Sequence, residues 1–111
     1  MSEKKVLHLT LKKKWFDMIA SGDKKEEYRQ DKPYWKQRFV KEGYWHSQTC
    51  KDFDTIIFRN GYVKNAPTME VECLGIKLKD LTDMKDGWFD YPVLGCRVFV
   101  ISLGKILSIS N

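Results

Sequence analysis

The chain has 111 residues, 42% of them hydrophobic and 14% aromatic, a composition that excludes a disordered polypeptide and suits one domain with one core. Its formal net charge of +5 permits a polyanionic partner without requiring one. The cysteines Cys50, Cys73 and Cys96 show no CxxC spacing, so neither a disulfide framework nor a metal site is predicted. No apolar run approaches the length of a membrane span, and we expect a cytoplasmic protein without a membrane partner.

The N-terminal part of the chain predicts a strand followed by a helix. Between residues 6 and 11, three leucines alternate with other residues, which is typical of a half-buried strand with its leucines inward. Trp15, Met18 and Ile19 then share one face at helical spacing, which predicts a helix of two to three turns. Gly22 is the expected C-terminal cap of this helix.

Two more elements are predicted in the following segment. Residues 24–30 come after a helix stop and have no apolar helical face, so we predict a strand. In residues 33–40, which begin with proline, Trp35 and Phe39 lie one helical turn apart. This spacing predicts a second short helix that ends near Gly43.

The remainder of the chain predicts strands and loops. The Asn60-Gly61 dipeptide follows an Ile-, Thr- and Phe-rich run and is a specific indication of a hairpin. Gly75 is a candidate bulge within a long β-like run. Residues 44–50 are predicted to be a loop, and residues 82–92 an irregular surface excursion. The predicted strands cover residues 53–58, 68–78 and 97–107.

These elements together define a fold class. Strands outnumber helices, most connections are short, and no βαβ alternation with a glycine-rich phosphate loop is present, so no cofactor is predicted. We predict the α+β class, with a small mixed β-barrel and two short helices at its edge. A single domain over residues 1–111 is expected.

The densest cluster of charged residues lies in residues 22–29, at the junction of the first helix and the next strand. In a regular strand, Glu27 and Arg29 lie on one face and Tyr28 on the other. Lys24 has the opposite parity to Glu27, but it follows a glycine turn that leaves its direction open. On the local sequence alone, a solvated edge strand is favoured over a site, because alternating Lys and Glu discourage edge pairing.

The order Gly22, Lys24, Glu27, Arg29 resembles the GxKxxExR signature of the ASCH domain family, which is PUA-like. The signature follows the expected strand and helix. The resemblance extends to the hairpin, to the strand after it and to the closing strand, so it covers nearly the whole chain. It implies a PUA-like barrel with a cleft between the barrel and the first helix.

In the family this cleft is proposed to hold RNA or a nucleotide, and the residue types suit that ligand. Lys24 and Arg29 can meet phosphate or a base edge, and Glu27 can accept a hydrogen bond from an exocyclic amine. Tyr62 is the candidate for stacking on a base, and Arg59 extends the basic surface. An RNA- or nucleotide-binding module is therefore the leading hypothesis, with a monomer favoured.

One bacterial branch of the family is an amidohydrolase that removes the acyl group from N4-acetylcytidine, and this is the alternative. The resemblance maps its lysine onto Lys24 and its glutamate onto Glu70. Where that branch has a threonine nucleophile, this chain has Glu27, which changes the mechanism. Glu27 or Glu70 would then activate water, while Lys24 or Arg29 would stabilise the oxyanion.

Several other aromatic, basic and histidine residues are candidates for a role in binding or catalysis. Trp15 and Trp35 can stack on bases, but their helical spacing favours core positions. Residues 12–14 are three lysines at a helix start, for which a salt-screened surface is favoured over an anion site. Nothing in the sequence orients His8 or His46, so neither is assigned a catalytic role.

Overall fold

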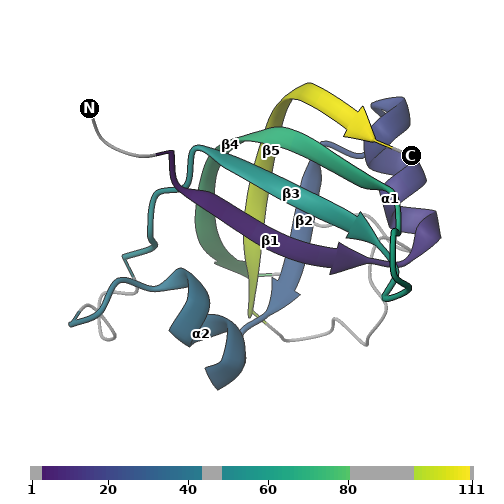
Figure 1. Ribbon diagram of the computed structural model, residues 1–111. Helices are drawn as coiled ribbons and strands as arrows, with labels where there is room; N and C mark the ends of the chain where they lie inside the picture. Colours follow the sequence, from purple (N-terminus) through teal and green to yellow (C-terminus); the bar gives the residue numbers. More distant parts are fainter. Residues whose placement is uncertain (1–3, 44–48, 81–96, 111) are drawn as a thin grey trace. The chain divides into compact units, whose positions relative to one another are not determined.

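The computed structural model describes residues 4–43, 49–80 and 97–110; the predicted excursion 82–92 and most of the predicted loop 44–50 lie outside these ranges. The described part contains helices and strands that confirm the α+β class (Figure 1). In chain order the elements are β1 (Val6–Leu11), α1 (Lys13–Ser21), β2 (Glu26–Gln30), α2 (Pro33–Phe39), β3 (Thr55–Asn60), β4 (Thr68–Asp80) and β5 (Arg97–Ser110).

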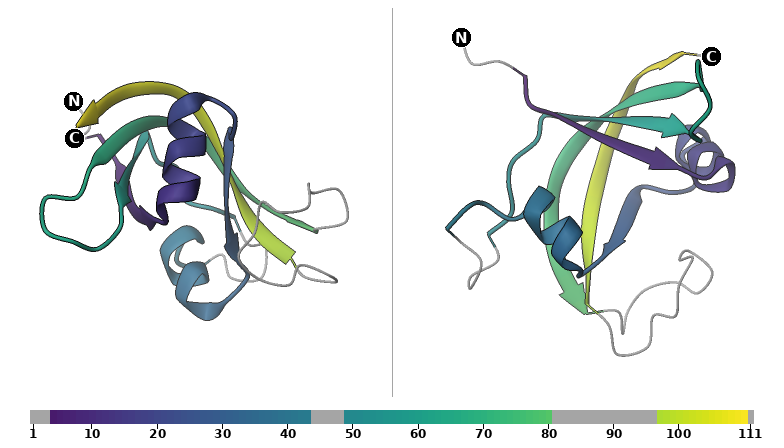
Figure 2. Two further views of the ribbon diagram at one scale, coloured as in Figure 1. Left: turned by 90° about the vertical axis from the view of Figure 1, so that its right-hand side faces the viewer. Right: turned by 60° about the horizontal axis from the view of Figure 1, so that its bottom comes forward.

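The strands form one mixed sheet in the order β1-β3-β4-β5-β2. β1 and β3 are parallel, with Val6 opposite Thr55, and their arrows point the same way in Figure 1 and in the right-hand view of Figure 2. β3 and β4 are antiparallel, with Thr55 opposite Glu72. The predicted hairpin is therefore confirmed, although Asn60 ends β3 and residues 61–67 form the connection.

The pairing of β2 with β5 is antiparallel. The Leu103 N–H donates to the Lys25 carbonyl at 3.0 Å, and the Asp31 N–H donates to the Arg97 carbonyl at 3.3 Å. Because the residue numbers rise along one strand as they fall along the other, the two strands run in opposite directions.

The chain divides into two compact units. The first unit comprises Met1–Glu27, Asp52–Gly75 and Ser102–Asn111, and the second comprises Tyr28–Lys51 and Ile76–Ile101. Strands β2, β4 and β5 each contribute residues to both units. The single domain and the closure of the sheet into a barrel stay predictions.

The first unit has a core built on alternating strand residues and one helix face. Leu7, Leu9 and Leu11 are each only 4% exposed, which confirms that the leucines of β1 point inward. Helix α1 contributes Trp15 and Ile19 to this core, as their spacing predicted. The buried apolar residues that β3 and β4 add to this core are Ile56, Phe58, Met69 and Val71.

The second unit packs α2 against the first half of β5. Phe39 is fully buried, and its ring meets that of Phe99 edge to face, with centroids 5.3 Å apart. Trp35 stacks on Phe39 from one helical turn away, with centroids again 5.3 Å apart. The predicted second helix is thus confirmed, and the two residues whose spacing predicted it are in contact.

The predicted end of the second helix near Gly43 is wrong. Helix α2 ends at Phe39, and Val40 is extended and forms a β-bridge with Cys50. The Lys51 N–H donates to the Phe39 carbonyl at 2.6 Å, so pairing with residues 49–51 ends the helix early.

Neither α1 nor α2, the helices of the described part of the chain, has the length and apolar character of a membrane span.

Candidate functional site

The charged cluster is shaped by the way α1 ends. Gly22 has φ +88°, a left-handed conformation that favours glycine, and its N–H donates to the Ile19 carbonyl at 3.1 Å. The Lys24 N–H then donates to the Met18 carbonyl at 3.0 Å. The chain therefore folds back over the last turn of the helix before β2 begins.

This turn places Lys24 beside Glu27 in a buried ion pair. The Lys24 ammonium donates to Glu27 Oε1, and the two residues are only 2% and 3% exposed. The predicted strand began at residue 24, but β2 begins at Glu26, so Lys24 lies in the turn and strand parity does not fix its direction. The structure thus brings together two of the predicted site residues.

Trp15 forms one wall of the buried ion pair. Trp15 is only 5% exposed, and Lys24 Nζ lies 4.8 Å from the centroid of its indole ring. A desolvated ammonium at this distance from an indole is attracted by the negative face of the ring. The core position expected for Trp15 is correct, and the residue also contacts the site, which helical spacing could not reveal.

The burial of both charges has an energetic consequence. Desolvation costs several kcal/mol for each ion, and a buried pair often adds no stability over apolar residues of similar size. Such a pair is therefore weak as a stabilising device. Clustered, desolvated titratable groups are, in contrast, typical of functional sites.

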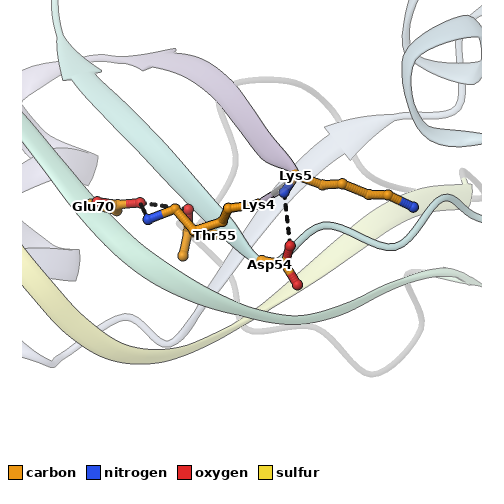
Figure 3. A network of polar contacts seen from close by, with 5 residues as sticks. All are labelled: Lys4, Lys5, Asp54, Thr55 and Glu70. Carbon is orange, nitrogen blue, oxygen red and sulfur yellow. Dashed lines mark hydrogen bonds and ion pairs between the residues drawn. The ribbon is translucent and has the colours of Figure 1, made fainter. Parts of the chain in front are cut away.

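Glu70 lies in a separate network of the first unit. Its strand neighbours Met69 and Val71 are 1% and 0% exposed, so alternation directs Glu70 to the opposite face of β4. Glu70 Oε2 accepts from Thr55 Oγ1 at 2.7 Å and pairs with Lys4 Nζ at 2.8 Å (Figure 3). The contacts of Glu70 are thus with Thr55 and Lys4, and a catalytic trio of Lys24, Glu27 and Glu70 stays a prediction.

The network around Glu70 lowers the pKa of its carboxyl group. Hydrogen bonds from Lys4 and then from Thr55 lower the pKa of the Glu70 carboxyl. Next to it, the Lys5 N–H donates to Asp54 Oδ2 at 2.7 Å and ties the start of β1 to β3 (Figure 3). These partners were missed by sequence reasoning, because they depend on strand register.

Arg29, the last residue of the signature, belongs to the second unit. Its Nη1 donates to the Tyr28 carbonyl at 2.9 Å, and its guanidinium carbon lies 5.1 Å from the centroid of the Trp35 ring. Arg29 thus holds its place through the backbone and through an aromatic side chain of α2.

Arg59 and Tyr62 mark the β3–β4 connection. Arg59 Nη2 donates to the Val63 carbonyl, and Tyr62 is 88% exposed. The guanidinium therefore fixes the connection that presents the tyrosine ring to solvent.

No arrangement for metal binding is found in the part of the chain that the structure describes, where no three His, Cys, Asp or Glu residues are grouped to hold an ion. Burial raises the pKa of the Cys50 and Cys73 thiols, which favours the neutral thiol over the nucleophilic thiolate.

The sequence matches no family model, and no curated protein matches it.

Proposed function

We propose that this chain is an ASCH-like module that binds RNA or a nucleotide, with the buried ion pair as its recognition centre. One observation carries the proposal: Lys24 and Glu27, two of the four signature residues, pair at 2% and 3% exposure against Trp15. The rest of the proposal is a PUA-like barrel that acts in the cytoplasm as a monomer.

The chemistry of the pair supports a nucleobase ligand. An ammonium next to a carboxylate offers a donor beside an acceptor, and the edge of cytosine offers acceptors beside an exocyclic amine. A base can therefore replace the contacts that Lys24 and Glu27 make with each other. In a desolvated site these hydrogen bonds are stronger than in water.

Binding can be tested by titrating cytidine 5′-monophosphate and N4-acetylcytidine into the protein in a calorimeter. The variant K24M/E27L removes both charges at once, so that neither is left buried alone and the fold is retained. We expect its affinity for both probes to fall at least about tenfold. Unchanged affinity in this variant, or no binding by the wild type, contradicts the proposal.

The first unit offers a matched control. Lys13 and Asp17 form an ion pair on α1 whose side chains are 79% and 51% exposed. The variant K13M/D17L makes the same change in charge at an exposed site. We expect it to bind both probes as the wild type does.

The amidohydrolase alternative draws on the same pair. The Lys24 ammonium can stabilise an oxyanion while Glu27, its partner in the ion pair, activates water. Chromatography of N4-acetylcytidine incubated with the protein is expected to show cytidine and acetate. Glu27→Gln should then abolish the release of cytidine, and full release by this variant rules the mechanism out.

A further inference from the structure

An aromatic and cationic surface lies on α2 in the second unit, and we call Tyr34, Trp35 and Arg38 the α2 platform. Tyr34 is 58% exposed, and its ring meets Trp35 edge to face at a centroid distance of 4.7 Å. A tyrosine ring that is exposed yet backed by a second aromatic ring is a pre-positioned stacking surface.

The base of the platform is packed against neighbouring side chains. Trp35 stacks on the fully buried Phe39 with an angle of 14° between the rings. The Arg29 guanidinium lies 5.1 Å from the Trp35 ring centroid. Because Trp35 is held by these two neighbours, little conformational freedom is lost when a ligand meets the adjoining Tyr34 ring.

Arg38 adds positive charge next to the exposed ring. It lies one helical turn after Tyr34, and its Nη1 donates to the Tyr34 hydroxyl at 3.2 Å. Its guanidinium carbon lies 5.6 Å from the Tyr34 ring centroid and 5.9 Å from that of Trp35. The platform therefore joins an exposed π-face to a cation.

We propose that the α2 platform binds single-stranded nucleic acid, with a base stacked on Tyr34 and an adjoining phosphate met by Arg38. Alternating bases and phosphates need this combination of ring and guanidinium. A purely apolar protein partner does not require arginine, and a simple anion does not require the ring. The inference takes its ligand class, nucleic acid, from the proposed function and rests on it to that extent. It adds a separate contact, on the second unit, for a strand of several nucleotides.

The stacking contact can be tested with fluorescein-labelled eight-nucleotide strands followed by fluorescence anisotropy. We expect Tyr34→Ala to weaken the binding of oligouridylate about tenfold, while Tyr34→Phe, which keeps the ring, binds as the wild type does. An abasic strand of the same length should bind equally to all three proteins. Equal oligouridylate binding by Tyr34→Ala and the wild type overturns the proposal, and so does an equal loss with the abasic strand.

The phosphate contact can be tested through the salt dependence of binding. Arg38→Ala should weaken the binding of both strands and reduce the slope of log K against log salt by about 0.7. An unchanged salt slope in Arg38→Ala removes the phosphate contact from the proposal.

Leu74→Ala is the control for Tyr34→Ala, because Leu74 is also an exposed large residue but belongs to the first unit. This control should leave the affinity for both strands unchanged.

The two sites can fail separately. Loss of nucleotide binding in K24M/E27L together with normal strand binding by Tyr34→Ala supports the buried ion pair and overturns the platform. The converse result supports the platform and overturns the buried ion pair as recognition centre. Repeating the anisotropy with RNA and DNA strands of one sequence identifies the sugar, because only RNA offers a 2′-hydroxyl.

Discussion

At the scale of single residues, the charge of Glu70 depends on the side chains around it. Its carboxylate accepts from Lys4 and Thr55, and both contacts favour the ionised form and lower its pKa from the ordinary value of 4.5. The stabilisation from these contacts is therefore complete above that ordinary value. It is lost as the pH falls through the lower pKa of the folded state.

Replacing Lys4 tests this assignment. We expect Lys4→Met to raise the pKa of Glu70 toward 4.5, because the largest contribution to the shift is removed. The difference in unfolding free energy between this variant and the wild type should be greatest at neutral pH and should shrink in acid. A carbon-detected NMR titration measures the pKa, and urea unfolding at several pH values measures the difference.

Lys5→Met is the control for this experiment. The Lys5 side chain extends away from Glu70, and its polar contact with Asp54 is made by the backbone N–H (Figure 3). The pKa of Glu70 should therefore be the same as in the wild type. If Lys4→Met also leaves that pKa unchanged, the ion pair is not its cause.

Residue types could be predicted from the sequence better than residue partners. The signature selected Lys24 and Glu27, and the structure pairs them, although strand parity argued against it. The partners of Glu70 could not be predicted in this way, because Thr55 meets Glu70 only through the antiparallel register of β3 and β4. Contacts set by the local turn were accessible to sequence reasoning, whereas contacts set by strand register were not.

At the scale of elements, Gly22 links the end of α1 to the position of Lys24. Its φ of +88° is easily adopted by glycine, tolerated by asparagine and unfavourable for alanine. We expect Gly22→Ala to lower the free energy of unfolding by about 1–2 kcal/mol. Gly22→Asn should lower it less, and urea unfolding followed by circular dichroism measures both.

The two Gly22 variants separate backbone strain from crowding. Apart from Gly22 and its two chain neighbours, no atom of the described residues lies within 4 Å of a Cβ added at Gly22, so the larger asparagine should not clash. If Gly22→Asn is as destabilised as Gly22→Ala, the left-handed conformation is not the cause. The role of Gly22 in the signature would then need another explanation.

The elements were predicted best where the signals are local. β1 was predicted with its observed bounds, and α1 with its C-terminal cap, because alternation, helical spacing and glycine act over short distances. The end of α2 was missed because the segment beyond Phe39 pairs with residues 49–51. The final strand also continues beyond the predicted Leu107, to Ser110.

At the scale of the whole molecule, the division into two units raises the question of how the chain unfolds. The boundaries at Glu27–Tyr28, Gly75–Ile76 and Ile101–Ser102 each fall inside a strand. Fraying one unit therefore breaks backbone pairing in strands that continue into the other. Composition predicted a single domain, and continuous strands are the physical reason to expect one cooperative transition.

Two conservative core variants test this cooperativity. Phe39 lies in the second unit and Ile56 in the first, and both are fully buried. We expect Phe39→Leu and Ile56→Val each to lower the free energy of unfolding by about 1 kcal/mol. If the chain unfolds as one, native-state hydrogen exchange should show each variant reducing the protection of the slowest amides in both units by the same amount. A variant that affects only the amides of its own unit, 55–60 for Ile56→Val or 98–101 for Phe39→Leu, would make the units separate folding domains despite their shared strands.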